Sequence, residues 1–169
     1  MEKPEIKINK SLIAIVLIGI MILVVVALFL PSYLDSRKKA KDGYYNDIAW
    51  GVSQEDLEQK LPEDALDSTD KMEFLHKVDD YEGLTGIDGM EVYHYEDGFS
   101  KVSVLVTIKD GSQYSAESAV DAFKDIYDKR YGKHDSTTFS YIWNTKKTRI
   151  TLLKFSDNML SIEYADSSR

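Results

Sequence analysis

The three histidines are the side chains of this sequence best suited to bind a metal or to transfer a proton, and they stand far apart at His76, His94 and His134. None of them belongs to an HxxxH pattern or to a similar spacing that brings two imidazoles to one metal ion. His94 lies within Tyr93-His94-Tyr95 on a predicted strand. There it is either a pH-sensitive or ligand-contacting group or a half-exposed strand residue. We favour the second interpretation and predict no metal site.

The carboxylates are abundant, but their spacing does not indicate a cation site. Asp64, Asp67 and Asp70 stand three residues apart, and a second acidic group follows within residues 79–82. Neither group has the register of an EF-hand, in which ligands occupy positions one, three and five and glycine occupies position six. We therefore predict solvated loop charges at both places and no cofactor.

The sequence contains no motif for nucleophilic catalysis or for phosphate binding. It has no cysteine, and it has no GxSxG, P-loop or GxGxxG pattern. Ser53 has no neighbouring base and is better placed as a helix cap. We therefore predict no catalytic residues and a non-enzymatic protein. An enzyme whose site assembles from dispersed polar residues is the alternative.

Tyrosine is over-represented, with 11 copies, and several aromatic residues fall on predicted strands. Tyrosine and tryptophan combine a large apolar ring with a polar tip, and they are enriched at protein interfaces. Packing in the core and rim of a sheet is the other interpretation, and we favour it for the group as a whole. If the residues instead form an interface, the partner contacts are Tyr93, Tyr95, Tyr141, Trp143 and Tyr164.

Two helices are expected to position these side chains. The first begins after Ser53, a good N-cap, and it ends before Pro62, which has no backbone N–H to donate. The second lies between Ser115 and Gly132, with apolar residues at three- and four-residue steps between the two caps. Trp50, just before the first helix, is expected to pack under the long second helix.

Alternating apolar residues predict five strands and one further edge strand. The strands cover residues 90–96, 101–108, 139–144, 149–155 and 160–165, and the edge strand covers residues 72–78. Short turns between consecutive strands imply an antiparallel sheet. The predicted fold class is α+β. One N-terminal transmembrane helix is followed by a small domain in which two helices pack on one face of an antiparallel sheet of about four to six strands.

The N-terminal part of the sequence predicts a membrane anchor. Residues 12–30 carry no charge, and a helix of this length spans about 28 Å, close to the hydrocarbon thickness of a bilayer. Pro31 closes the run, and Tyr33 follows where an interfacial aromatic residue is expected. A cleaved signal peptide is the alternative, but no small-x-small cleavage pattern follows the run.

Charge divides the chain into a basic beginning and an acidic remainder. Residues 1–41 carry seven basic and three acidic side chains, whereas residues 42–169 carry 14 and 26, a formal charge of −12. An acidic domain repels phosphate backbones, so we predict no nucleic-acid partner. The predicted organisation, by residue range, is a basic tail (1–10), a transmembrane anchor (11–31), a basic linker (32–43) and an α+β extracytoplasmic domain (44–166).

The orientation in the membrane is less strongly indicated. The basic residues on the two sides of the apolar run nearly balance, so the positive-inside rule does not decide between the two sides. The position of the N-terminal flank before the first apolar segment favours a C-terminal domain outside the cytoplasm. A cytoplasmic domain is the alternative.

A set of short motifs follows one another in a recognisable order. Trp50-Gly51-Val52-Ser53 opens the first helix, and the later motifs are Tyr131-Gly132-Lys133, Trp143, Ile150-x-Leu152 and Leu160-Ser161-Ile162-Glu163-Tyr164. This order resembles small bacterial envelope domains that open with WGxS/T. Their fold is similar to one repeat of the β-lactamase inhibitor protein and to outer-membrane assembly lipoproteins of the SmpA/OmlA type. The resemblance implies an exported, non-enzymatic domain that works by interaction. The lipidated cysteine and the second repeat are absent from this sequence, and no specific partner is implied.

The sequence thus predicts a membrane-anchored, non-enzymatic protein- or peptide-binding module of the bacterial cell envelope. Residues 12–30 would hold it in the lipid bilayer, and an envelope protein or peptide would bind the open face of the sheet. Two alternatives remain: a cytoplasm-facing, membrane-tethered regulatory domain, and an enzyme with a site that the sequence does not reveal.

Overall fold

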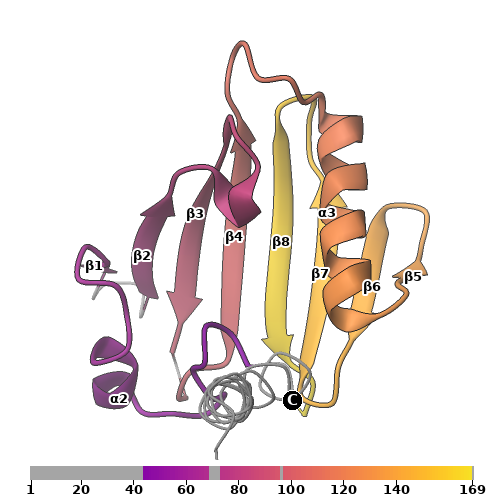
Figure 1. The fold of residues 1–169 in the computed structure, drawn as a ribbon. Coiled ribbons are helices and arrows are strands. Elements are labelled where there is room, and N and C mark those ends of the chain that lie inside the picture. The colour runs from indigo at the N-terminus through magenta and orange to yellow at the C-terminus, as the bar shows by residue number, and fades with distance from the viewer. Residues whose placement is uncertain (1–43, 69–72, 96, 169) are drawn as a thin grey trace, which may run out of the picture. The chain divides into compact units, whose positions relative to one another are not determined.

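A computed structural model describes residues 44–68, 73–95 and 97–168, and it shows them as one antiparallel sheet with a long helix on one face (Figure 1). The strands are β1 (Leu66–Ser68), β2 (Glu73–Val78), β3 (Ile87–His94), β4 (Lys101–Ile108), β5 (Asp135–Ser136), β6 (Ser140–Asn144), β7 (Thr148–Lys154) and β8 (Met159–Asp166). The helical elements are α2 (Gln54–Glu58), the single 3-10 turn η2 (Tyr81–Gly83) and α3 (Ala116–Tyr131).

Two meanders meet in the middle of the sheet. The strand order is β1-β2-β3-β4-β8-β7-β6-β5. The first four strands follow one another, α3 then runs along the face of the other half of the sheet, and the last four strands return until β8 pairs antiparallel with β4. The register between these two strands runs from Lys101 opposite Ala165 to Thr107 opposite Met159. The two halves of the sequence are therefore joined by one central pair of strands.

One face of the sheet forms the core because apolar side chains alternate along each strand. On β4, Val102, Val104 and Val106 are fully buried, and they lie opposite Tyr164, Ile162 and Leu160 on β8. Helix α3 packs over β6, β7 and β8 on this face (Figure 1). Segment 44–52 and η2 lie over β3 and β4 (Figure 1) and bury Tyr45, Ile48 and Tyr81.

Helix α3 confirms the predicted long helix with both of its caps. The Ser115 side chain accepts a hydrogen bond from the backbone N–H of Ser118, and the Ser118 side chain accepts one from the N–H of Ser115. Gly132 ends the helix at φ 93°, a conformation that residues with a side chain rarely adopt. The buried side chains of the helix are Ala116, Ala119, Val120, Phe123 and Tyr127.

The first helix begins as predicted, but Trp50 lies elsewhere than expected. The Ser53 side chain accepts from the Asp56 N–H and caps α2. Trp50 is half-buried and packs on Phe99, with ring centroids 4.7 Å apart, and its indole N–H donates to Thr148 Oγ1 at 2.7 Å. It therefore secures the start of the domain to the β3–β4 connection and to β7, and the expected position under the long helix is corrected.

The predicted fold class, two helices on a sheet of about four to six strands, is wrong: the described domain is mostly sheet and has one long helix. The sheet has eight strands where about four to six were expected, and α2, at five residues, is little more than one helical turn. Residues 66–68, expected to be part of a loop, form β1, and residues 135–136, for which no strand is predicted, form β5. These strands have two or three residues, which is too short for an alternating pattern to show in the sequence.

The predicted membrane anchor is also corrected. Residues 11–31, which were assigned to it, lie outside the described residues. Among residues 44–68, 73–95 and 97–168, no helix is long and apolar enough to cross a membrane. The predicted transmembrane helix and single-pass membrane location therefore have no counterpart in the described domain, and neither enters the functional proposal.

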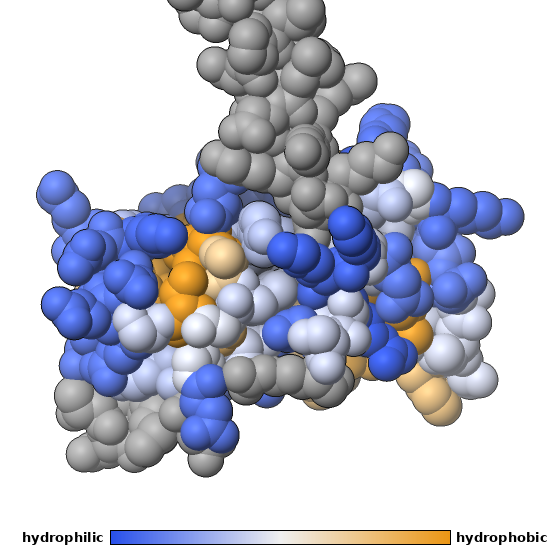
Figure 2. All heavy atoms as spheres, turned by 90° about the horizontal axis from the view of Figure 1, so that it is seen from below, coloured by the Kyte–Doolittle hydropathy of each residue, from blue (hydrophilic) through white to orange (hydrophobic). Residues whose placement is uncertain are grey.

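The lower end of the sheet presents a mostly hydrophilic surface. Figure 2 looks at this end and shows polar side chains around small hydrophobic patches. One shallow hollow near α2 is lined by Leu61, Pro62, Ala65 and Phe74 together with three acidic residues. This distribution agrees with the formal charge of −12 for residues 42–169.

Candidate functional site

The aromatic residues predicted to contact a partner lie on the covered face of the sheet. Tyr93, Tyr95, Trp143 and Tyr164 are at most 7% exposed, whereas Tyr141 is half-buried. Because Tyr93, Tyr95, Trp143 and Tyr164 are buried, a partner that approaches the domain surface would not meet them. Tyr141 lines a surface groove between α3 and β6.

A carboxylate is buried on the covered face of β3. Glu91 is 4% exposed, and its Oε1 accepts a hydrogen bond from the Tyr45 hydroxyl. Its Oε2 accepts from the Tyr93 hydroxyl at 2.7 Å and lies 2.9 Å from His76 Nδ1. A buried carboxylate is costly unless several donors surround it, and three groups do so here.

A row of tyrosine hydroxyls extends from this carboxylate across the core. The Tyr45 and Tyr81 oxygens are 3.5 Å apart, those of Tyr81 and Tyr164 are 3.3 Å apart, and those of Tyr164 and Tyr127 are 2.6 Å apart. Burial raises the pKa of all four hydroxyls above the ordinary tyrosine value. Each hydroxyl therefore keeps its proton, and the row links α3, β8, η2 and segment 44–52 to Glu91.

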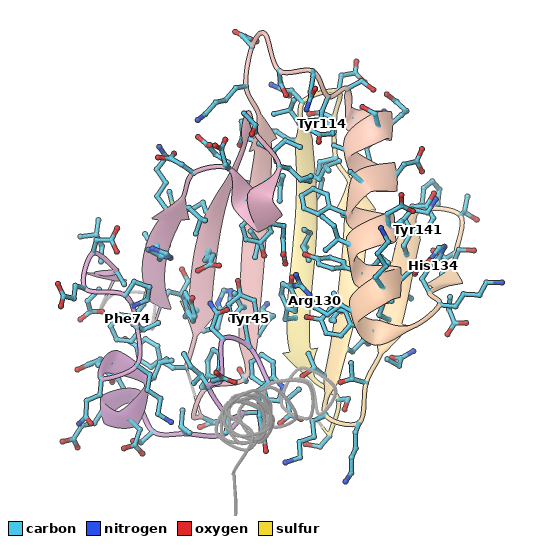
Figure 3. The ribbon with its side chains drawn as sticks, in the orientation of Figure 1. Tyr45, Phe74, Tyr114, Arg130, His134 and Tyr141 are labelled. Atoms are coloured by element: carbon cyan, nitrogen blue, oxygen red, sulfur yellow. The ribbon has the colours of Figure 1, made fainter. Side chains whose placement is uncertain are left out.

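A cavity of about 310 Å³ lies beside this row and is partly closed by an ion pair. The Arg130 guanidinium donates two hydrogen bonds of 2.7 Å to the Glu82 carboxylate. These bonds raise the pKa of Arg130. Figure 3 shows Tyr45 and Arg130 between the two halves of the domain. Every buried side-chain N or O atom among the described residues has a hydrogen-bond partner, so we assign the hydroxyl row to the stability of the core.

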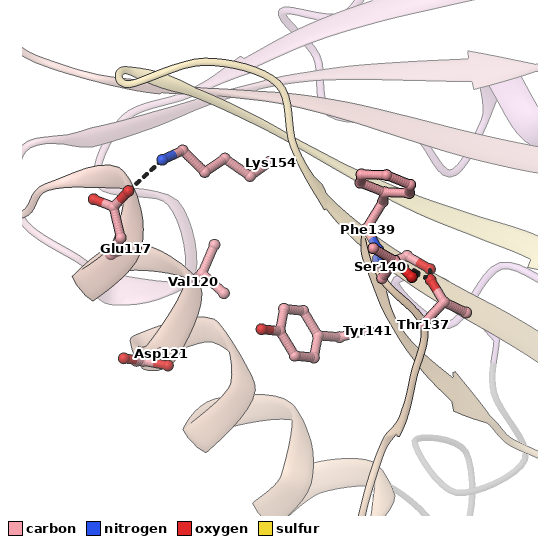
Figure 4. A pocket seen from close by; sticks show the side chains of 9 residues that line it. Glu117, Val120, Asp121, Thr137, Phe139, Ser140, Tyr141 and Lys154 are labelled. Carbon is pink, nitrogen blue, oxygen red and sulfur yellow. Dashed lines mark hydrogen bonds and ion pairs between the residues drawn. The ribbon is translucent and has the colours of Figure 1, made fainter.

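Another hollow, of about 460 Å³, is a groove between α3 and the loop that leads into β6 (Figure 4). Val120, 7% exposed, and the half-buried Tyr141 form its apolar part. Phe139 lines it too, yet the Phe139 side chain is 81% exposed. The groove therefore joins a formed apolar surface to a large ring that the domain itself does not cover.

Charged side chains line the helix side of the groove. Lys154 forms an ion pair with Glu117, which lowers the pKa of the Glu117 carboxyl (Figure 4). Asp121 pairs with Lys124 at 3.0 Å, and the Lys124 ammonium lies 4.7 Å from the centre of the Tyr141 ring. The two carboxylates remain largely open to solvent, with side chains 71% and 72% exposed. The groove thus combines apolar contact with two exposed carboxylates, each of which already pairs with a lysine.

Each of the three histidines lies beside a different carboxylate. His76 contacts Glu91, His134 Nδ1 lies 2.8 Å from Asp128, and His94 Nδ1 lies 3.0 Å from Glu73. Among the described residues, no group of three or more histidine or acidic side chains is arranged to hold a metal ion. His134 also packs against the ring of Tyr141 beside the groove (Figure 3).

No family model, curated protein or solved structure matches the chain. The resemblance to the inhibitor protein and to the assembly lipoproteins therefore stays an untested prediction, and function must be argued from the geometry. The sequence does not reveal the groove because its pattern places Phe139 on a strand, whereas β6 begins at Ser140. A clue was present in Thr137, Thr138 and Ser140, since polar residues surround Phe139 and signal a loop.

Proposed function

We propose that the described domain is a protein- or peptide-binding module and that the groove between α3 and β6 is its binding site. The single observation that carries this proposal is Phe139, 81% exposed beside the Val120 and Tyr141 side chains. An exposed aromatic ring beside packed apolar side chains and within a polar rim is a common form of an interaction hot spot. This site replaces the open sheet face that the sequence suggested, because four of the five aromatic residues on which that idea rested are buried.

The occupant that fits this groove is an extended segment of a partner protein with an apolar side chain next to a basic one. The apolar side chain would pack against Phe139 and Val120. The basic side chain would meet the exposed carboxylates of Glu117 and Asp121. The formal charge of −12 on residues 42–169 favours the approach of a basic segment.

Selection of peptides from a random display library on the immobilised full chain tests the proposal. A selected peptide is synthesised, labelled and titrated with the protein by fluorescence anisotropy. We expect Phe139→Ser to weaken its binding by roughly tenfold or more, the range for a truncated hot-spot residue. Asp121→Asn should slow association, because rim charges act chiefly on the rate of encounter.

Phe155 provides the matched control. It is another exposed phenylalanine, at 67%, but it lies in the β7–β8 turn and does not line the groove. Phe155→Ser should leave the affinity unchanged. Equal losses for the two serine variants, or selected peptides that bind Phe139→Ser as well as the wild type, would reject the groove as the binding site.

A further inference from the structure

Three side chains from three neighbouring strands form a hydrogen-bonded line on the sheet face opposite the groove. His94 on β3 lies between Glu73 on β2 and Ser103 on β4. Its Nδ1 is 3.0 Å from Glu73 Oε1, and its Nε2 is 3.1 Å from Ser103 Oγ. The two ring nitrogens therefore contact two different partners, a carboxylate on one side and a hydroxyl on the other.

The register of the sheet holds these three residues together. Glu73 lies directly opposite His94, and Ser103 lies opposite Val92, two residues from His94 and on the same face. The neighbouring Tyr93 points to the other face and is buried, so it keeps His94 turned outward. The His94 and Glu73 side chains are 24% and 22% exposed, so the line is partly packed and still reachable from solvent.

A carboxylate beside Nδ1 favours the tautomer with its proton on Nδ1, which leaves the Nε2 lone pair free to accept the serine proton. We propose that Ser103 is a nucleophile, activated by His94 and oriented through Glu73, that accepts an acyl group from activated esters. This inference goes beyond the proposed binding function and uses the opposite face of the sheet, so either can fail without the other.

The surroundings of His94 favour its neutral form, the form that can accept a proton. Burial and then the positive charge of Lys101 lower the pKa of His94, and together they outweigh Glu73 and Glu163, which raise it. The imidazole is therefore neutral near pH 7 and able to take a proton. Lys101 stands two residues before Ser103 on the same face and pairs with Glu163 across 3.6 Å; its positive charge would favour the oxyanion that forms during attack.

The proposed step is the transfer of an acyl group to the serine oxygen. Ser103 Oγ attacks the carbonyl carbon of an aryl ester, and the hydroxyl proton moves to His94 Nε2. The bond from the carbonyl carbon to the aryloxide breaks, and the aryloxide leaves with the bonding electrons. The products are an acylated serine and a protonated His94, which then releases its proton to water.

Covalent labelling of the full chain tests this proposal. The protein is incubated with p-nitrophenyl acetate or a fluorophosphonate, adducts are counted by intact mass, and the modified residue of the wild type is located by peptide mapping. We expect one adduct, on Ser103, and none in Ser103→Ala. His94→Gln should slow labelling by about 100-fold, the lower end of the usual effect of a general base.

Two further measurements separate an activated serine from a merely exposed one. Ser161→Ala removes a serine of the same face on neighbouring β8, and labelling should be unaffected. The labelling rate should rise with pH around a midpoint below the ordinary histidine value of about 6.5. Mapping of the adduct to Ser161 or to lysine, an unchanged rate in His94→Gln that remains folded by circular dichroism, or no adduct at all would overturn the proposal.

Discussion

Glu91 is the single residue whose surroundings most restrict what can replace it. Its carboxylate accepts from the Tyr45 and Tyr93 hydroxyls and lies beside His76 Nδ1. The two tyrosine hydroxyls donate to the carboxylate, which has two acceptor oxygens. A glutamine of the same shape has only one acceptor oxygen, and its other terminal atom is a donor. Replacement of Glu91 would therefore change the hydrogen bonding of Tyr45, Tyr93 and His76 together.

Glu91→Gln is expected to lower the free energy of unfolding by about 3 kcal/mol, because the amide NH₂ faces donors and leaves a buried hydroxyl unpaired. Urea denaturation monitored by circular dichroism measures the loss. Glu163→Gln is the control, since Glu163 is 44% exposed and pairs with Lys101 across 3.6 Å. This change should cost less than about 1 kcal/mol. Equal losses in the two variants would contradict a special role for the buried carboxylate.

His94 should titrate below the ordinary histidine pKa of about 6.5, because burial and Lys101 both disfavour its charged form. The neutral form is then favoured by folding. Its contribution to stability is present above pH 6.5 and is lost as the pH falls through the folded-state pKa. Histidine ring resonances followed by NMR give the midpoint, and Lys101→Gln should raise it. A His94 titration midpoint above that of histidine in an unfolded peptide would contradict the prediction.

At the scale of elements, the segment before α2 attaches the start of the domain to both halves of the sheet. Trp50 stacks on Phe99, which follows β3, and its indole donates to Thr148 at the start of β7. The backbone N–H of Gly51 donates to the Phe99 carbonyl, and the N–H of Phe99 donates to the Val52 carbonyl. The opening motif thus acts by joining segments that are far apart in the sequence.

Trp50→Ala should cost about 2–3 kcal/mol, below the roughly 3–5 kcal/mol of a fully buried ring, because Trp50 is only half-buried. Trp50→Phe keeps the ring contact and loses only the hydrogen bond to Thr148, so it should cost about 1 kcal/mol. Thermal and urea unfolding of both variants measure the difference. If the phenylalanine variant proves as unstable as the alanine variant, ring packing is not the main contribution.

At the scale of the whole molecule, the core depends on hydroxyl groups as well as on apolar packing. The row from Tyr127 to Glu91 crosses from the long helix to β3 and joins the two meanders beside their central strand pair. Loss of a proton from any hydroxyl in this row would place a second negative charge near the buried carboxylate. The domain as a whole should therefore be sensitive to alkaline pH.

The expected alkaline sensitivity has a definite sign. Burial raises the pKa of Tyr45, Tyr81, Tyr127 and Tyr164, whereas tyrosines of the unfolded chain titrate near about pH 10. The contribution of the protonated hydroxyls to the free energy of unfolding is fully present below about pH 10 and declines as the pH rises above it. Urea midpoints and tyrosinate absorbance measured across this range test it. A midpoint that stays constant while tyrosinate forms in the folded protein would contradict the prediction.

Secondary structure that depends only on neighbouring residues can be predicted from the sequence alone. The strand at 101–108, the helix between Ser115 and Gly132, and the cap at Ser53 are confirmed, because alternation, helical spacing and capping act over a few residues. Strand pairings and side-chain contacts between residues distant in the sequence appear only in the tertiary structure. The tertiary structure pairs β4 with β8, forms β1 and β5, buries Tyr93, Tyr95 and Tyr164, and sets His94 between Glu73 and Ser103. Side chains contributed by separate strands leave no local pattern, so their contact appears only when the strands are in register.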